Sequence, residues 1–268
     1  MARRLRALMG LLATAALVLL MPPERAGASI PQPVKGDQRA RQIIERAVIA
    51  HGGRQAWLSK KDASFSTTWT HYTGGLPSFS SRYVVKFPIA AGPVPTVVEG
   101  DENGKPVLMG VSGSRSWFMV GGERFDDVDS LKANRAFVRK AYGLVALPFR
   151  LDDPAIDIAY DGEEVRAGAV VDRVRVTSGL EPSGLYLFDR ETGRLAGMGS
   201  EVASPPTATV SDYTDFAQMD GILIPRRQVF DRVDMTTGGR SRILTVRIDT
   251  VRFDNGFAPD TFEPPPVR

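Results

Sequence analysis

The sequence predicts an α+β protein: a strongly curved antiparallel sheet of about ten or eleven strands, forming a half-open β-barrel, with two helices packed on its concave side. Three observations lead to this prediction. Many short segments alternate apolar and polar residues as strands do, and turn signals separate them. Two longer segments carry apolar residues at helical spacing instead. An antiparallel sheet of this size curls because its strands twist, and the resulting concave face can receive the helices.

The N-terminus is typical of a secreted protein. Three arginines among the first six residues precede an apolar run from Leu8 to Met21, and small residues follow at 26–28. This pattern predicts a signal peptide over residues 1–28, followed by a flexible leader over residues 29–38. A retained membrane anchor is the alternative, but the apolar run is shorter than the ~20 residues that a spanning helix needs. We therefore expect a bacterial periplasmic or secreted protein.

Charge and cysteine content narrow the possible functions. The chain has 34 Lys plus Arg and 31 Asp plus Glu, and residues 1–28 hold four of the arginines and one of the glutamates. The remainder is formally neutral, so the composition gives no support for binding nucleic acid. The chain has no cysteine, so no disulfide stabilises the fold and no cysteine can carry a lipid anchor. Stability must come from a hydrophobic core.

The first helix is predicted over residues 39–51. Asp37 is a suitable N-cap, and Gly52 and Gly53 supply the left-handed residue that commonly ends a helix. Trp57 is then expected to anchor the turn that leads the chain into the barrel. The helix carries one apolar stripe: Ala40, Ile43, Ile44, Ala47, Val48 and His51.

Strands and a second helix follow in order. The predicted strands cover 63–72, 81–88, 94–100, 105–111, 115–120, 169–177, 184–190, 194–202, 207–217, 222–234 and 241–254. The second helix is predicted over 127–147, with aspartates at its start and Pro148 as its end. We find no internal repeat and no linker, so residues 39–268 are expected to form a single domain.

The sequence offers little for catalysis. It has two histidines, His51 and His71, and no phosphate-binding, zinc-protease or nucleophile-elbow motif. His51 is interpreted as a structural residue whose protonated ring interacts with the helix C-terminus. His71 alternates with Trp69 on a strand and is expected to face the interior. Acidic pairs lie beside turns or helix starts, where solvated carboxylates are ordinary. We predict no catalytic residue, no metal site and no cofactor.

The aromatic and aliphatic residues on the strands indicate a possible apolar cavity, since a site for an acyl chain needs apolar walls and few polar groups. The predicted cavity residues, chosen by strand alternation, are Trp69, Tyr83, Val85, Phe87, Phe118, Val174, Val176, Leu244 and Val246. The second helix would act as a lid through Leu131, Val138 and Tyr142.

Several stretches resemble a known family. Residues 43–53, which end in His-Gly-Gly ahead of Trp57, resemble the opening of outer-membrane lipoprotein-sorting, or LolA-like, periplasmic lipoprotein carriers. Three C-terminal stretches resemble the same proteins: GLYLFDRETGRLAGM, DYTDFAQMDGILIPRRQVF and VRIDTVRFDNGFAPDTFEPP. The resemblance covers about residues 39–265. It implies a half-open β-barrel, capped by helices, with an apolar cavity.

Three functions remain open. The first is a monomeric, non-enzymatic binding protein that holds a lipid, an acyl chain or a lipidated protein and touches the membrane only transiently. The second is an envelope sensor or scaffold that binds a partner protein at the barrel rim. Some of the proteins that this sequence resembles regulate envelope stress. The third is a hydrolase that uses His71 and acidic residues. Cavity volume and lid mobility distinguish the first two, and substrate turnover tests the third.

Overall fold

The computed structural model describes residues 37–90, 94–102, 104–153, 156–177, 184–203 and 206–266. Its helices are α2 (Gln38–Ala50), α3 (Arg54–Leu58), α4 (Val128–Leu151) and a final 3-10 turn, η1 (Pro259–Phe262). The predicted signal peptide and most of the predicted leader lie outside the described residues. No helix among the described residues is both long and apolar enough to cross a membrane.

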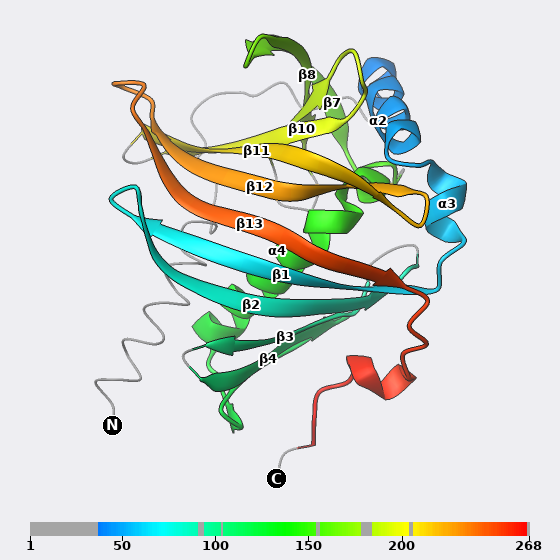
Figure 1. Cartoon of the computed structure of the whole chain (residues 1–268), viewed down its shortest axis with the longest axis vertical. Coiled ribbons are helices and arrows are strands. Elements are labelled where there is room, and N and C mark those ends of the chain that lie inside the picture. Colours follow the sequence, from blue (N-terminus) through cyan, green and yellow to red (C-terminus); the bar gives the residue numbers. More distant parts are fainter. Residues whose placement is uncertain are drawn as a thin grey trace.

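All thirteen described strands belong to one antiparallel sheet (Figure 1). The strands are β1 (Asp62–Thr73), β2 (Leu76–Pro88), β3 (Thr96–Glu102), β4 (Lys105–Ser112), β5 (Arg115–Val120), β6 (Glu123–Arg124), β7 (Ile158–Arg166), β8 (Ala169–Val176), β9 (Gly184–Asp189), β10 (Leu195–Ala203), β11 (Pro206–Met219), β12 (Ile222–Asp234) and β13 (Arg240–Phe253). The sheet is strongly curved and unclosed, which confirms the predicted half-open barrel.

The strand order places helix α4 across the open side of the sheet. The order is β6-β5-β4-β3-β2-β1-β13-β12-β11-β10-β9-β8-β7, so two meanders meet where β13 pairs with β1. α4 connects β6 to β7, which are the two outer edges. A helix of 24 residues is about 36 Å long. It therefore spans the barrel along its concave side, behind β1 and β13 in Figure 1.

Helix α2 forms as its sequence predicts. The Asp37 side chain accepts hydrogen bonds from the backbone N–H groups of Arg39 (3.0 Å) and Ala40 (3.1 Å), which confirms the predicted N-cap. The helix ends at Ala50, and Gly52 follows with a φ of +110°. The apolar stripe is buried throughout: Ala40, Ile43, Ile44, Ala47 and Val48.

The structure corrects several predicted boundaries. Helix α4 does not end at Pro148 but continues to Leu151. Trp57 lies on a short helix, α3, that was not predicted, although it is buried as expected. Strand β2 begins at Leu76 rather than at residue 81. The sheet gains two strands at its edges, β6 and β7, so it has thirteen strands instead of ten or eleven.

A side chain from the sheet explains why α4 passes through Pro148. Proline has no N–H, so the carbonyl four residues earlier loses its helical hydrogen bond. That carbonyl belongs to Leu144, and Gln228 Nε2 on strand β12 donates to it at 3.1 Å. Because Gln228 is fully buried, this bond satisfies a carbonyl that water cannot reach. The helix can therefore continue for one more turn.

Three clusters of buried side chains hold the fold together. The largest lies between α4 and strands β1–β5, β12 and β13. The second lies between α2, the end of α4 and strands β7–β11. The third is on the convex side, where Phe262 of η1 packs on Val97 and Trp117. The Trp117 ring requires Gly110 on the neighbouring strand, because a Cβ there would lie 2.0 Å from the ring.

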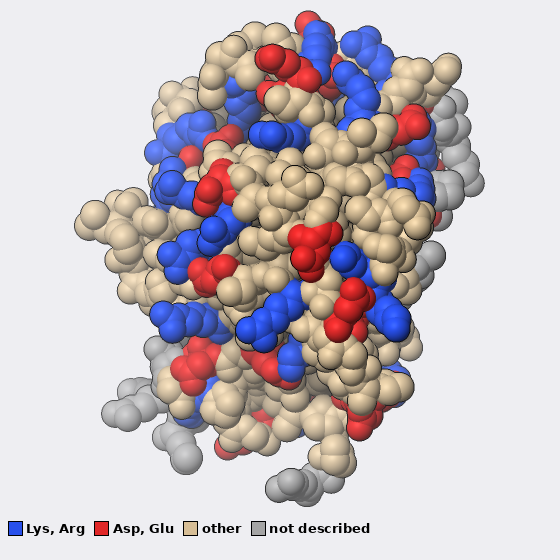
Figure 2. Space-filling model, turned by 45° about the vertical axis from the view of Figure 1, so that its right-hand side comes forward, with Lys and Arg blue, Asp and Glu red and all other residues tan. Residues whose placement is uncertain are grey.

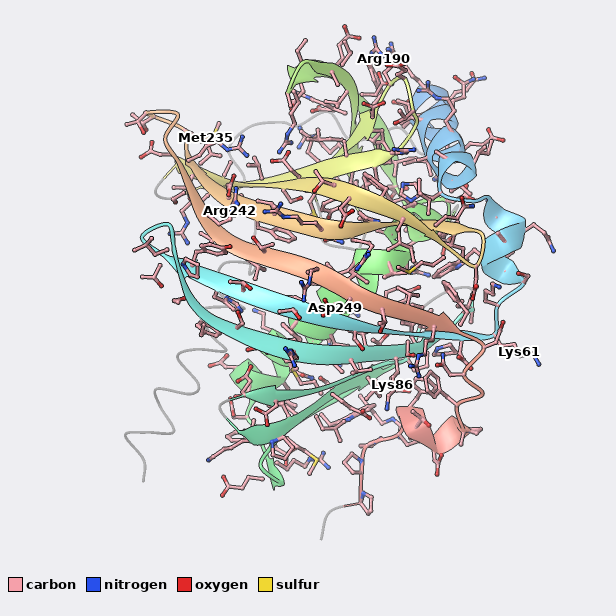
Figure 3. The ribbon with its side chains drawn as sticks, in the orientation of Figure 1. Lys61, Lys86, Arg190, Met235, Arg242 and Asp249 are labelled. Carbon is pink, nitrogen blue, oxygen red and sulfur yellow. The ribbon has the colours of Figure 1, made fainter. Side chains whose placement is uncertain are left out.

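The exterior carries charges of both signs. Figure 2 shows basic and acidic side chains interspersed over the face it presents. On strand β13, Arg242 pairs with Asp231 (2.9 Å) and Arg247 pairs with Asp249 (2.6 Å). Figure 3 labels Arg242 and Asp249 on this strand, and labels Met235 near the end of the β12–β13 hairpin. This mixed charge gives no large single-sign field on that face.

Candidate functional site

The concave face of the sheet is the candidate site, and strand pairing decides which residues line it. Across β1 and β13, Trp69 lies opposite Val246, and His71 lies opposite Leu244. Residues directly opposite each other share a face of the sheet. Since Trp69 and Val246 are buried in the cluster under α4, His71 also faces inward, as predicted.

The structure brings together most of the predicted cavity residues. One cluster under α4 contains seven of them: Trp69, Tyr83, Val85, Phe87, Phe118, Leu244 and Val246. Val174 and Val176 are equally buried but belong to the second cluster, beneath α2. The predicted wall is therefore divided between two helices. That these residues bind a ligand is a prediction.

Helix α4 covers the first group, as the predicted lid would. Val138 and Tyr142 are buried in the cluster, and the Tyr142 ring meets Phe87 edge to face at 4.7 Å between centroids. Leu131 is only half-buried and lies outside the cluster. Phe137, which the lid prediction left out, packs on Trp69 at 5.0 Å and on Tyr83 at 5.3 Å.

In this conformation, side chains of α4 fill the centre of the concave face. Two hollows among the described residues lie elsewhere. One, of about 600 Å³, is beside α2 and is lined by ionic side chains such as Arg46, Asp172 and Arg190. The other, of about 460 Å³, lies between Trp117 and the C-terminal prolines. An apolar cargo therefore needs α4 to move.

Two buried side-chain hydrogen bonds lie on the inner face. Trp69 Nε1 donates to Thr67 Oγ1 at 2.9 Å, and the Tyr83 hydroxyl donates to Glu102 Oε1 at 2.6 Å. Burial raises the pKa of Glu102, although the Tyr83 hydrogen bond opposes the shift. The second Glu102 oxygen has no partner among the described residues. These groups fix the Trp69 and Tyr83 rings in the wall.

The N-terminal half of α4 is attached to the sheet through backbone carbonyls. Asn134 Nδ2 lies within hydrogen-bond distance of the Ser116 hydroxyl (2.7 Å) and of the carbonyl oxygens of Trp117 (3.0 Å) and Gly110 (3.3 Å). Arg135 donates to the carbonyl of Gly113 at 3.3 Å. These contacts gather at the β4–β5 hairpin. In the middle of the helix, Val138, Ala141 and Val145 pack on the sheet in the first cluster.

Sequence reasoning missed a charged residue on the same side of α4. Lys140 lies three residues after Phe137 and four before Leu144, and its Nζ is 4.1 Å from the centroid of the Phe230 ring. Burial lowers the pKa of Lys140 to about 7. A lysine inside an apolar helical stripe was the available signal, because such a position ordinarily holds an apolar residue.

His51 is structural, as predicted, but it is neutral rather than protonated. Its Nδ1 lies 2.7 Å from the Leu223 carbonyl oxygen, and its Nε2 accepts a hydrogen bond from the Leu195 N–H at 3.2 Å. A ring that donates through Nδ1 and accepts through Nε2 carries a single proton. Burial lowers the pKa of His51 to about 4. The ring therefore joins α2 to two strands by hydrogen bonds instead of compensating the helix dipole.

This assignment predicts a pH dependence. His51 in the unfolded chain takes up a proton near pH 6.5, whereas in the folded protein it does so near pH 4. The contribution to stability is therefore fully present above about pH 6.5 and is lost as the pH falls toward 4, by up to about 3 kcal/mol. Nuclear magnetic resonance of the imidazole nitrogens should show a neutral His51 ring at pH 5.5. Titration near pH 6.5 would contradict the assignment.

His71 has surroundings that differ from those of a catalytic base. Its ring stacks on Phe79 at 4.2 Å between centroids. Burial lowers the pKa of His71 to about 4, and the nearby positive charge of Lys140 adds to the shift. Among the described residues, no serine or carboxylate is hydrogen-bonded to this ring, and no three His, Asp or Glu side chains gather as metal ligands would.

The architecture and the covered apolar face define the class of protein. An unclosed antiparallel sheet with a helix laid across its concave side is a LolA-like fold, and solved structures of that fold match this chain over most of its length. No protein-family model matches the sequence, and no curated protein matches it.

Three solved structures illustrate the likeness. A DUF1329 family protein from Desulfovibrio piger has a TM-score of 0.55 at 12% identity, over 86% of this chain and 98% of that one. A putative outer membrane lipoprotein-sorting protein domain from Vibrio parahaemolyticus has a TM-score of 0.53 at 11% identity, over 84% of this chain and 97% of that one. A LolA superfamily protein from Nitrosomonas europaea has a TM-score of 0.52 at 14% identity, over 83% of this chain and 96% of that one. At these identities the likeness establishes the fold alone.

Proposed function

We propose that this protein is a periplasmic, non-enzymatic binding protein that holds a lipid, an acyl chain or a lipidated protein on its concave face beneath α4. One observation carries the proposal: a wide apolar sheet face is covered by a single helix rather than by a second sheet. A single amphipathic helix can be displaced without breaking any strand pairing. The lipoprotein-sorting name of one structural neighbour agrees with this class of cargo.

The present conformation is then the closed one. Opening requires the part of α4 that precedes Leu144 to leave the sheet while the rest stays in place. Leu147 and Leu151 pack in the second cluster with α2, and Arg41 of α2 donates to the carbonyls of Asp153 and Ile156. The C-terminal end of α4 is thus fixed. Pro148 is the natural hinge, because the helix lacks one of its own hydrogen bonds there.

The remaining features of the proposal concern location and partners. The signal-like N-terminus supports export to the periplasm, and the balanced charge supports neither nucleic-acid nor strong anionic-membrane binding. Leu76 and Met235 are exposed at hairpin ends, where an apolar side chain could touch a membrane transiently. We expect a monomer that receives its cargo from a membrane or from a lipidated partner.

A second candidate is an envelope sensor or scaffold that binds a partner protein at the barrel rim. The packing of Phe137 and Tyr142 into the concave face favours it, because a scaffold needs a filled interior and a carrier needs one that can be emptied. The two functions differ in whether any lipid enters beneath α4.

Native mass spectrometry of the protein purified from the periplasm, followed by solvent extraction, tests the proposal. We expect an additional mass that is released as lipid. The variant Leu244→Gln places an amide in the apolar wall and should reduce the bound lipid several-fold. Val165→Gln makes the same kind of change at a side chain that is 73% exposed, so it should leave the lipid in place.

A protein without bound lipid that also takes up no fluorescent acyl probe would contradict the carrier function and leave the scaffold.

A further inference from the structure

The concave face contains an ammonium group without a carboxylate partner. Lys140 Nζ lies over the Phe230 ring, and among the described residues no Asp or Glu oxygen lies within 4.0 Å of it. Lys140 is half-buried. Removing a charged amine from water is unfavourable unless another charge or hydrogen bond replaces the water. An anion at this place would supply the missing interaction.

The surrounding groups favour an anion. His71 on β1 is close enough for the charge of Lys140 to lower its pKa. Arg226 on β12 shares the concave face with Gln228, and its Nε donates to the Ile248 carbonyl at 3.3 Å. Glu102, the buried acid of these strands, accepts a hydrogen bond from Tyr83 through one of its two oxygens. His71, a base that burial keeps neutral, is thus a titratable neighbour that feels the charge of Lys140.

The sheet divides next to Lys140. The pairing of β1 with β13 ends at His71 and Leu244. Beyond that point the β1–β2 hairpin continues to Thr73 opposite Leu76, and the β12–β13 hairpin continues to Val233 opposite Arg240. Figure 1 shows the two hairpins separating. We call this place the fork, defined by His71, Leu244 and the two hairpin ends.

The ends of both hairpins carry exposed apolar side chains. Leu76 is 72% exposed and Met235, labelled in Figure 3, is 56% exposed. Exposed apolar side chains on two neighbouring hairpin ends can meet lipid together. From the fork, the apolar inner wall begins at Leu244 and continues to Val246 and Trp69.

We propose that the fork admits a single acyl chain that ends in a carboxylate, and that Lys140 binds this carboxylate while the chain lies along Leu244, Val246 and Trp69. The inference rests on the proposed binding function and specifies its ligand as a long-chain fatty acid anion. His71 and Phe79 stack at the fork, next to the headgroup. In the closed conformation the Lys140 ammonium lies over the Phe230 ring.

A competition assay with a fluorescent acyl probe tests the proposal. Palmitic acid and methyl palmitate have the same chain but differ in charge at the headgroup. Near pH 6 Lys140 is protonated, because its pKa is about 7. We expect the wild-type protein to bind the acid at least about tenfold more tightly than the ester, which is typical of a hydrogen bond to a charged group.

Two variants separate the amine from the chain site. Lys140→Met keeps the length and apolar character of the side chain, so it should bind acid and ester about equally, with the ester affinity unchanged. Lys132→Met removes an exposed lysine from the same helix and should keep the preference for the acid. Circular dichroism checks that each variant is folded.

The outcomes distinguish the two proposals. Equal binding of acid and ester by the wild type, or a preference for the acid that survives in Lys140→Met, would overturn the role of Lys140 and leave the binding function intact. Binding of neither ligand, and of no probe, would remove the binding function itself.

Discussion

Replacing Gly52 with valine is expected to lower the free energy of unfolding by more than about 3 kcal/mol, because backbone strain and a steric clash coincide at this position. Gly52 has a φ of +110°, which a β-branched residue adopts only with strain. Its Cβ would also lie 2.1 Å from the carbonyl oxygen of Gly221, which belongs to the turn between β11 and β12. Thermal unfolding should show a decrease of about 10 °C in Tm.

Gly53→Val is the matched control. Gly53 also has a positive φ, of +86°, but no atom lies within 4 Å of the position that its Cβ would take. This variant should therefore show only the cost of backbone strain, and a smaller loss of stability than Gly52→Val. Equal losses of stability in the two variants would show that the close approach of α2 to the β11–β12 turn does not contribute to the effect of Gly52→Val.

Replacing Phe137 with alanine is expected to decrease stability while increasing ligand affinity. Removing a buried phenylalanine costs about 3–5 kcal/mol, because the contacts with Trp69 and Tyr83 are lost. The same change weakens the closed position of α4. If the closed state loses 1.4 kcal/mol of stability relative to the open state, the open fraction rises up to about tenfold. The apparent affinity for the ligand rises by the same factor. Chemical denaturation and titration with a fluorescent acyl probe measure the two effects.

Phe149→Ala provides the control for this prediction. Phe149 is also an aromatic residue of α4, but it lies after Pro148 and stacks on Trp57 at 4.6 Å between centroids. Its loss should decrease stability without changing probe binding, because the segment that moves does not include it. If Phe137→Ala decreases stability and the affinity does not rise, α4 acts as a fixed part of the core and not as a lid.

Local patterns were sufficient to predict the regular parts of the fold. The apolar stripe of α2 repeats at helical spacing and is buried as predicted. Burial alternates strictly along β1 from Phe65 to Trp69, and the aromatic residues at the two ends of this stretch indicated the inward face in the sequence. Strand β7 was missed because it is an edge strand with an irregular pairing, and four of its nine residues, among them Glu163 and Glu164, are charged.

Other features depend on contacts between distant residues. Pro148 ends a helix by the local rule, and only the bond from Gln228, eighty residues later, shows why α4 continues. Alternation assigned Val174 and Val176 to the inner face correctly, but the strand order decides that α2 covers them and not α4. The filling of the concave face by Phe137 is likewise a property of packing, which periodicity alone does not reveal.

The position of α4 relative to the sheet, with and without ligand, tests the central claim most directly. Since the chain has no cysteine, spin labels can be placed only where cysteines are introduced, for example at Lys132→Cys on α4 and Ser80→Cys on β2, both exposed. A second pair on the sheet, at Ser80 and Thr214, serves as the reference. We predict that, with an acyl ligand, a second and longer distance between the two spin labels appears for the first pair. The distance between the labels of the second pair should stay unchanged. Saturating ligand with no change in the distance from α4 to the sheet would contradict the account.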